Sequence, residues 1–406
     1  MIFTYAPAGL GHLRVTDALV DSRPKDIPYI MLGSYDRFIT DIHRITSNNP
    51  IARLIFTVSQ YGLMEEIYIM LYRFLLVHSA GPIYKNLKEV ISRRKDADEV
   101  WVVATHFGMA HQIGAVKERL IKETGVKIKL IVQVTDDTSQ HIWCVRGADL
   151  SFVPSLFTKE KLERYSRKWR MNLNFEVIPY PISPILTKRI EPPGEKRQMT
   201  FLSDTKSINV AVPISGAAVG LSYISGLIKT VSLKSDRFQF WVLAKKSLQT
   251  EMFLGVLGKL KNVHLVTGRN DNEIIGLYEL LYQNNLIHLE ITKPSEQAFK
   301  AILPPNLVGG SLLLLANPVG RQEYENIDFL KRHGLIPSES EMIPRAIRLP
   351  KEPKSAADFI LWGLESGLFL KMSSDDFKFS VESLKSGEVG PDGAKDFWKI
   401  VEKHFD

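Results

Sequence analysis

The sequence predicts an α/β protein built from two parallel-sheet domains, and three observations carry this prediction. Apolar, β-branched runs alternate with helical periodicities in both halves of the chain, which is typical of parallel α/β sheets. The length of 406 residues suits two domains, because a single domain usually has about 100–200 residues. Apolar residues make up 45% and charged residues 24% of the chain, which excludes a disordered, collagen-like or coiled-coil protein.

Strands in the first half are expected wherever a short apolar run is bounded by polar or turn-forming residues. These runs are Met1–Tyr5, Tyr29–Leu32, Glu99–Ala104, Ile128–Val134 and Phe175–Ile178. Between the third and fourth runs, apolar residues recur at spacings that place them on one face of a helix. They are Met109, Ile113, Val116 and Leu120.

The second half repeats this alternation. Its expected strands are Ile208–Pro213, Phe238–Leu243, Val263–Val266, Ile287–Ile291 and Leu312–Leu315. Helices are expected to start near Gly220, Asn272, Ser295 and Gln322. Gly334, after a run of basic residues, predicts the end of the last of these helices. Ser355, with Asp358 three residues on, predicts a capping box at the start of another.

A polar, proline-bearing stretch over residues 181–207 breaks both periodicities and predicts an interdomain linker. We expect a first domain over residues 1–185, a linker over 186–206, a second domain over 207–390 and a C-terminal amphipathic helix within 391–406. Two such domains predict a ligand site in the cleft between them, near the carboxyl ends of the strands.

Charge is unevenly distributed, because the whole net charge of +7 lies in residues 1–200. The first half is therefore expected to face something anionic. Within it, residues 51–80 are rich in large apolar side chains. They are interpreted either as core helices or as a face that docks on a membrane surface beside the basic excess.

No secretory signal or membrane span is predicted. The two long uncharged stretches, residues 207–228 and 303–320, are interrupted by Pro, Gly and Asn. The one cysteine, Cys144, excludes an internal disulfide framework and suits a reducing compartment, so a cytoplasmic location is expected.

Four clusters carry residues suited to chemistry, each directly after a predicted strand. They are Ala8–His12, Ser215–Gly220, Thr292–Gln297 and Pro318–Asn326. Small residues after a strand let free N–H groups at a helix start approach an oxyanion or phosphate. The histidine in the first cluster, His12, is a candidate general base. Tight βα turns also need small residues, so each cluster alone is equally consistent with a structural turn.

Taken in order, these clusters resemble the GT-B glycosyltransferases, two Rossmann-like domains facing across a cleft. The most similar types are monogalactosyldiacylglycerol synthase, the processive diacylglycerol glucosyltransferases and the N-acetylglucosaminyltransferase that forms lipid II. The matching segments, in chain order, are Ala8–His12, Thr105–Gly108, Val134–Asp136, His141 with Trp143 and Asp149, Phe152–Ser155, Ile178–Pro181, Ser215–Gly220, Thr292–Ser295, and Gly320 with Gln322, Glu323 and Asn326.

The resemblance implies transfer of a sugar from a nucleotide diphosphate, expected to be UDP, to a lipid-linked or membrane-proximal acceptor. It implies that His12 is the catalytic base and that the acceptor side holds Gly9, Gly11, His106 and Asp136. The donor side would hold Ser215, Gly216, Ala217, Gly268, Lys293, Pro294, Ser295, Glu296, Gln322 and Glu323. It implies no bound metal and no cofactor beyond the nucleotide-sugar co-substrate, with possible association at the inner face of the membrane. The adjacent acids Asp136 and Asp137 have no third ligand at suitable spacing.

Four alternatives stay open or are set aside. Lys300 stands near the position where the family has a ribose-binding glutamate, which favours a related protein that binds without catalysis. A nucleotide-sugar epimerase would share the architecture. A nicotinamide-dependent oxidoreductase is disfavoured, because neither small-residue loop has a full Gly-x-Gly-x-x-Gly followed by an acidic ribose ligand. Scattered basic residues give no support for nucleic-acid binding.

Overall fold

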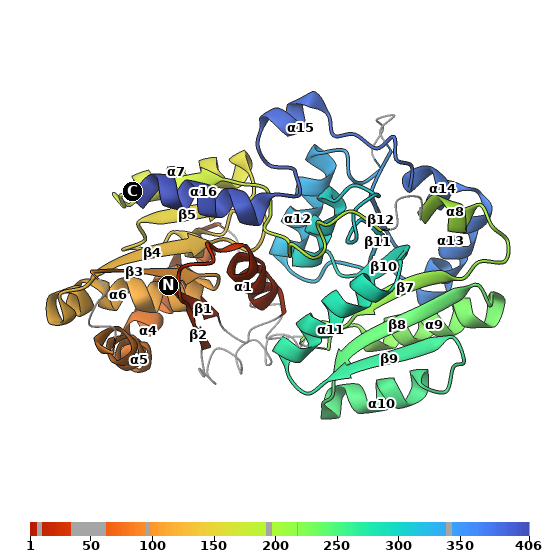
Figure 1. Cartoon of the computed structure of the whole chain (residues 1–406), viewed down its shortest axis with the longest axis horizontal. Coiled ribbons are helices and arrows are strands. Elements are labelled where there is room, and N and C mark those ends of the chain that lie inside the picture. Colours follow the sequence, from red (N-terminus) through yellow and green to blue (C-terminus); the bar gives the residue numbers. More distant parts are fainter. Residues whose placement is uncertain are drawn as a thin grey trace. The chain divides into compact units, whose positions relative to one another are not determined.

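The computed structural model describes residues 1–5, 10–33, 62–93, 98–191, 197–216, 218–337 and 343–405. The chain divides into two compact units. Unit 1 comprises Met1–Pro181, Ser386–Glu388 and Gly393–Asp406, and unit 2 comprises Ile182–Lys385 and Val389–Asp392. Each unit is an α/β layer structure around a six-stranded parallel sheet (Figure 1).

The unit 1 sheet has the strand order β2-β1-β3-β4-β5-β6. Its strands are β1 (Ile2–Tyr5), β2 (Ile30–Gly33), β3 (Glu99–Ala104), β4 (Lys127–Gln133), β5 (Leu150–Val153) and β6 (Phe175–Val177). Its helices are α1 (Leu10–Ser22), α4 (Gly62–His78), α5 (Gly81–Ser92), α6 (Phe107–Thr124), the 3-10 turn η1 (His141–Trp143), α7 (Leu156–Lys168) and α16 (Gly393–Phe405). The chain runs from β1 outward to β2 and then returns to the other side of β1, so strand order reverses between β1 and β3.

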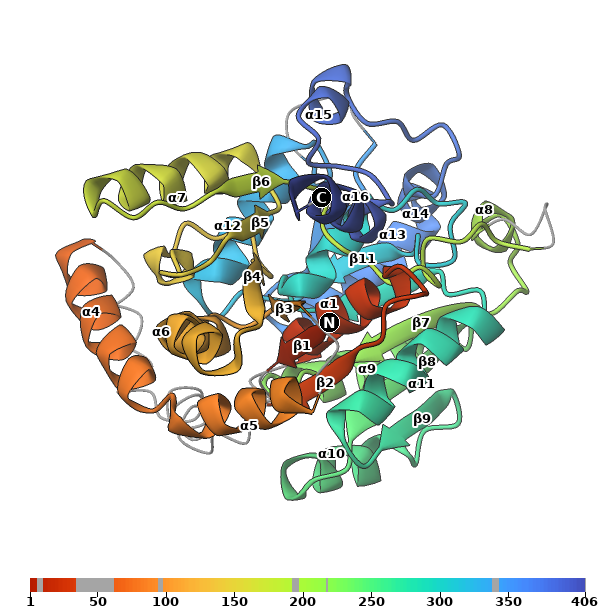
Figure 2. The ribbon, with the colours of Figure 1, turned by 60° about the vertical axis from the view of Figure 1, so that its left-hand side comes forward.

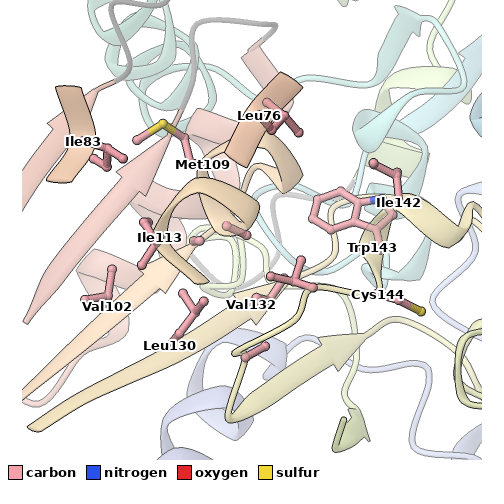
Figure 3. Close-up of a cluster of buried hydrophobic side chains, with 14 of the residues drawn as sticks. Leu76, Ile83, Val102, Met109, Ile113, Leu130, Val132, Ile142, Trp143 and Cys144 are labelled. Carbon is pink, nitrogen blue, oxygen red and sulfur yellow. The ribbon is translucent and has the colours of Figure 1, made fainter. Parts of the chain in front are cut away.

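Helix α6 packs against β3 and β4 on one face of this sheet, and α4 and α5 pack against α6 (Figure 2). The side chains Val102, Leu130 and Val132 of β3 and β4 meet Met109 and Ile113 of α6 in a buried apolar cluster (Figure 3). The predicted helical face is confirmed, since Met109, Ile113 and Leu120 are buried and Val116 packs against the same cluster.

The C-terminal helix α16 belongs to unit 1 and contacts α1. The Trp398 indole N–H donates to the Leu19 carbonyl at 2.8 Å. The Phe397 ring lies 4.4 Å from the Phe152 ring of β5. The final helix therefore helps to bury the second face of the first sheet.

The unit 2 sheet has the order β12-β11-β10-β7-β8-β9. Its strands are β7 (Ile208–Pro213), β8 (Phe238–Lys245), β9 (Val263–Gly268), β10 (Leu289–Thr292), β11 (Leu312–Leu315) and β12 (Ala346–Arg348). Its helices are α8 (Arg197–Phe201), α9 (Leu221–Lys234), α10 (Leu248–Leu257), α11 (Asp271–Asn284), the 3-10 helix η2 (Glu296–Ile302), α12 (Arg321–Arg332), α13 (Pro353–Glu365), α14 (Leu368–Met372) and α15 (Val381–Lys385). Strand order reverses between β7 and β10.

The short helix α8 lies inside the stretch that the sequence assigns to a linker, and Arg197 fixes it to unit 2. The guanidinium of Arg197 is buried and donates to the carbonyls of Ile287 at 2.6 Å, Leu307 at 2.9 Å and Val308 at 2.6 Å, and also to Pro305. Four carbonyl partners satisfy four of the five N–H donors that burial removes from water.

One detail of the sequence analysis is wrong. The predicted capping box at Ser355 does not start a helix, because α13 begins at Pro353 with Glu352 as its N-cap. Proline suits this first position, since it lacks the N–H that a helix start leaves unpaired. The helix expected near Ser295 is confirmed, as the 3-10 helix η2 with Ser295 as its N-cap.

Among the buried histidines, His111 in unit 1 and His288 in unit 2 are expected to make the stability of their unit fall in mild acid. Burial, reinforced by the charge of Arg73, lowers the pKa of His111 from 6.5 to about 3. Burial and the charge of Arg197 lower the pKa of His288 to about 3 in the same way. As pH falls from about 6.5 towards 3, the unfolded chain gains these protons and the folded chain does not. Each histidine should therefore remove about 1.4 kcal/mol of stability per pH unit.

Urea unfolding at pH 7 and pH 5 measures this effect before most carboxylates titrate. His111→Gln and His288→Gln should each flatten the pH dependence of the unfolding free energy. A pH dependence unchanged in both variants would contradict this assignment.

Candidate functional sites at two sheet edges

Strand order reverses at one point in the sheet of each unit. Parallel α/β sheets bind ligands outside the carboxyl ends of the strands, where strand order reverses. In unit 1 this point lies after β1 and β3, and in unit 2 it lies after β7 and β10. The predicted clusters follow these strands.

His12 lies in the first turn of α1, after β1, and its side chain reaches the residue that ends β3. The His12 Nδ1 lies 2.8 Å from the Thr105 carbonyl and 3.1 Å from the Thr135 hydroxyl. A carbonyl oxygen can only accept, so Nδ1 carries the proton that it donates to Thr105. In the neutral ring the lone pair is then on Nε2. The surrounding backbone therefore selects the tautomer in which Nε2 can accept a proton.

His106 has a different position and a different task. It is the N-cap of α6, where its Nδ1 accepts the Gly108 backbone N–H at 3.1 Å. Its ring is buried, stands edge-on to His12 with centroids 4.8 Å apart, and stacks on Phe107 at 4.6 Å.

The side chains of the two adjacent aspartates, Asp136 and Asp137, have different surroundings. Asp136 is partly exposed and directly follows Thr135. Asp137 is buried, and its Oδ1 accepts the hydroxyl of Thr158 at 2.7 Å and that of Ser155. Asp137 thus fixes the start of α7. Among the residues that the structure describes, no three His, Cys, Asp or Glu side chains form a group that could hold a metal ion.

Two predicted site residues, Gly9 and Ala217, lie outside the described residues. Gly11 is buried in the first turn of α1, next to His12. In unit 1 the structure therefore brings together His12, Gly11, His106 and the backbone before Asp136.

In unit 2 the loop after β7 has features suited to an anion. The Ser215 carbonyl accepts the Ala218 N–H at 2.8 Å, and Ala218 and Gly220 both have positive φ angles, 52° and 82°. This compact turn leads into α9, whose N-cap is Gly220. The Ser215 Oγ is buried and has no hydrogen-bond partner within the described chain. A buried hydroxyl without a partner is uncommon and is consistent with a ligand contact.

Loops after β10 and β11 are tied together by side chains from both predicted clusters. Lys293 Nζ lies 3.3 Å from Glu323 Oε1, and the Asn326 side-chain amide donates to the Pro294 carbonyl at 3.1 Å. Glu323 also accepts the Val319 N–H at 2.6 Å. The buried Glu323 thus links the loop after β10 to the loop after β11. Gln322 lies beside it in the first turn of α12. Ser295 and Glu296, at the start of η2, are partly exposed.

Gly268 ends β9, two strands away from β7 in the sheet. The structure therefore does not bring Gly268 into the same group of loops as Ser215 and Lys293, although it lies at the same edge.

Lys300 is buried in the core of unit 2. In the sequence it stands near the position where the GT-B family has a ribose-binding glutamate. Its Nζ lies 2.6 Å from Glu290 Oε2, 2.6 Å from the Tyr278 hydroxyl and 2.7 Å from the Tyr282 hydroxyl. Burial and the charge of Glu290 raise the pKa of Tyr282 well above 10, so its hydroxyl stays protonated and donates to Glu290 at 2.5 Å. Sequence reasoning missed this cluster. The one available signal was an acid in the otherwise apolar strand β10.

The two parallel sheets with their surrounding helices define the GT-B class, which has two Rossmann-like domains. Solved structures of this class match nearly the whole chain. UDP-GlcNAc 2-epimerase from Neisseria meningitidis bound to UDP-GlcNAc matches with a TM-score of 0.54 and 12% identity, covering 99% of this chain and 98% of that one. MurG from Acinetobacter baumannii has a TM-score of 0.50 and 11% identity, covering 99% of both chains. The spinosyn rhamnosyltransferase SpnG has a TM-score of 0.52 and 10% identity, covering 99% of both chains.

At these identities the likeness shows the fold alone. No protein-family model matches the chain, and no curated protein matches it in sequence.

Proposed function

We propose that this protein is a glycosyltransferase that moves a sugar from a nucleotide diphosphate, UDP in the first instance, to an acceptor hydroxyl. The observation that carries the proposal is the 2.8 Å contact between His12 Nδ1 and the Thr105 carbonyl, from which the Nδ1–H tautomer of His12 is inferred. The lone pair on Nε2 suits a base at the point where strand order reverses in unit 1.

In this reaction His12 Nε2 accepts the proton of the acceptor hydroxyl. The acceptor oxygen forms a bond to the anomeric carbon of the sugar, and the bond from that carbon to the diphosphate oxygen breaks. The departing diphosphate takes the bonding pair, and backbone N–H groups and polar side chains stabilise the charge that develops on it.

The loop after β7 is the proposed diphosphate site, formed by Ser215, Gly216 and Ala217. Support comes from the buried, unpartnered Ser215 hydroxyl and from the start of α9, whose N–H groups favour an anion. Lys293, Pro294, Ser295 and Glu296 would border the donor pocket. Gln322 and Glu323 would contact sugar hydroxyls.

Lys300 is committed to Glu290, so it is not available to bind a ribose. Glu296, partly exposed in the loop after β10, is the acid we propose in that role.

The proposal that the acceptor is lipid-linked or membrane-proximal rests on the exposed side of α4. No helix within the described residues is long and apolar enough to cross a bilayer. Large apolar side chains of α4 are nevertheless exposed, with Met70 at 64%, Leu71 at 57% and Phe74 at 60%. Beside α4 lies α7 (Figure 2), joined to it by Lys168 and Glu66 at 2.6 Å.

The end of α7 carries exposed basic and aromatic side chains. They are Arg164, Arg167, Lys168, Trp169 and Arg170. An exposed apolar helix face flanked by basic residues and a tryptophan suits an anionic lipid surface.

Replacement of Met70 and Phe74 together by glutamate is expected to weaken binding to anionic vesicles at least about tenfold, because two exposed apolar side chains that would enter the lipid surface become charged. Co-sedimentation with phosphatidylglycerol vesicles at low and high salt measures this. Leu233→Glu is the matched control, since Leu233 is 86% exposed on α9 of unit 2. Wild-type protein that stays in the supernatant at low salt would contradict the docking proposal.

Epimerisation of a nucleotide sugar is the second candidate, because the 2-epimerase from Neisseria meningitidis has the same fold with a TM-score of 0.54. Incubation of the protein with a UDP-sugar, with and without a lipid-linked acceptor, separates the candidates. Transfer predicts a glycosylated acceptor and free UDP only when the acceptor is present. A changed sugar still attached to UDP, or a released free sugar, without acceptor would favour the epimerase. Binding without any product would favour a non-catalytic relative.

A further inference from the structure

We propose that Arg73 and Glu65 of α4 are positioning residues for His12, acting through the turn η1 and the side chain of Trp143. The inference rests on the proposed function only in treating His12 as the base. The structural basis is a series of contacts within unit 1 that runs from α4 through η1 to His12.

Arg73 binds both ends of η1. Its Nη2 donates to the His141 carbonyl at 2.5 Å and to the Cys144 carbonyl at 3.1 Å. Its Nη1 donates to the Tyr165 hydroxyl at 3.2 Å, and the Tyr165 ring stacks on the His141 ring at 4.0 Å. One guanidinium therefore fixes the backbone immediately before and after Ile142 and Trp143.

Glu65 holds the start of the same turn. The His141 backbone N–H donates to Glu65 Oε1 at 3.1 Å, and the His141 ring lies 3.6 Å from the same carboxylate. On the other side, the His111 Nε2 of α6 bonds the Ile142 carbonyl at 2.7 Å. Three carbonyls and one N–H of the segment 141–144 are thus bound by side chains of α4 and α6.

These contacts matter because η1 is a single 3-10 turn of three residues. Such a turn has too few internal hydrogen bonds to hold its own position. Hydrogen bonds from a charged donor or to a charged acceptor are the stronger kind. The position of η1 is therefore expected to depend on Arg73 and Glu65.

Trp143 connects η1 to the residues that follow β1 and β3. Its ring lies 6.5 Å from the His12 ring and stands edge-on to Phe107 at 5.6 Å. Phe107 stacks on His106, which in turn stands edge-on to His12 at 4.8 Å. The His12 ring is therefore connected to η1 in two ways, through direct proximity to Trp143 and through the rings of His106 and Phe107, which contact Trp143. A displacement of η1 is expected to move the His12 ring, and small displacements of a catalytic group are costly.

The test compares Arg73→Met, Arg73→Lys and Glu65→Gln with the control Arg93→Met. Arg93 is also an arginine of unit 1, the C-cap of α5, but its side chain is 76% exposed and pairs with Glu89 of that helix at 2.5 Å. Circular dichroism and thermal unfolding select variants that fold. Two measurements are then made on each, the ¹⁵N chemical shifts of the His12 ring and the steady-state constants for transfer.

In the wild type the ¹⁵N shifts should show a protonated Nδ1 and an unprotonated Nε2. Arg73→Met should move these shifts towards an average of tautomers and lower kcat about 10- to 100-fold, with the donor KM unchanged. Arg73→Lys and Glu65→Gln should give smaller changes of the same sign, and Arg93→Met none. A folded Arg73→Met protein with wild-type His12 shifts would overturn the proposal. A wild type without transfer activity would count against the proposed function, while the shifts would still decide on positioning.

Discussion

Replacement of His12 by alanine is expected to reduce sugar transfer about 10²- to 10⁴-fold, the usual contribution of a general base. Affinity for the nucleotide sugar should change little, because His12 lies in unit 1 and the proposed diphosphate loop lies in unit 2. Initial rates with acceptor, together with donor titration of the same protein, give the two quantities.

The matched control is His404→Ala, which removes an exposed histidine of α16 in the same unit. It should leave both quantities unchanged. Transfer by His12→Ala at the wild-type rate would remove His12 from the mechanism. A parallel loss of donor affinity would mean that His12 acts in binding.

Replacement of Lys300 by methionine is expected to lower the unfolding free energy of unit 2 by about 3–5 kcal/mol, the usual result of leaving one partner of a buried ion pair alone. The side chains of Lys300 and Glu290 are 4% and 0% exposed, with 2.6 Å between Nζ and Oε2. In Lys300→Met the Glu290 carboxylate keeps its hydrogen bonds from the Tyr278 and Tyr282 hydroxyls but loses the ammonium group of Lys300. Urea unfolding followed by tryptophan fluorescence measures the change.

Two comparisons separate charge from packing in this cluster. The double variant Lys300→Met/Glu290→Gln removes both charges, so it should regain part of the lost stability. Lys234→Met removes an exposed pair with Asp358 in the same unit and should cost less than about 1 kcal/mol. A double variant as unstable as the sum of its single variants would show that the two charges are not coupled.

Most of the fold could be predicted from the sequence, because buried parallel strands are short apolar runs that stand out locally. The expected strands Glu99–Ala104, Ile208–Pro213 and Leu312–Leu315 match the structure to the residue. Strands β5 and β12 were missed. The three residues of β12 lie between Pro344 and Pro350 and include Arg348, so no apolar run marks this edge strand.

The candidate sites could be predicted only in part. Small residues and polar residues after strands are visible in the sequence, and topology then places them at one edge of a sheet. The partners of those residues cannot be seen. Thr105 and Thr135 follow strands β3 and β4, far along the chain from His12, and only the arrangement of the sheet brings them to its Nδ1.

Lys300 illustrates the same limit. Its spacing after Lys293 suggested the donor site, but a one-dimensional pattern does not show which way a side chain points. The structure turns it towards Glu290, and the compensating charge makes burial of both residues possible.

Isothermal titration of the protein with UDP-, GDP- and TDP-sugars tests the central claim most directly. The account predicts one saturable site for at least one of these donors. Ser215→Ala should weaken it about tenfold, the effect of one lost hydrogen bond to a charged group. Ser232→Ala should not, although its hydroxyl on α9 is likewise buried and unpartnered within the described chain. No binding of any nucleotide sugar, or equal weakening by both variants, would contradict the account.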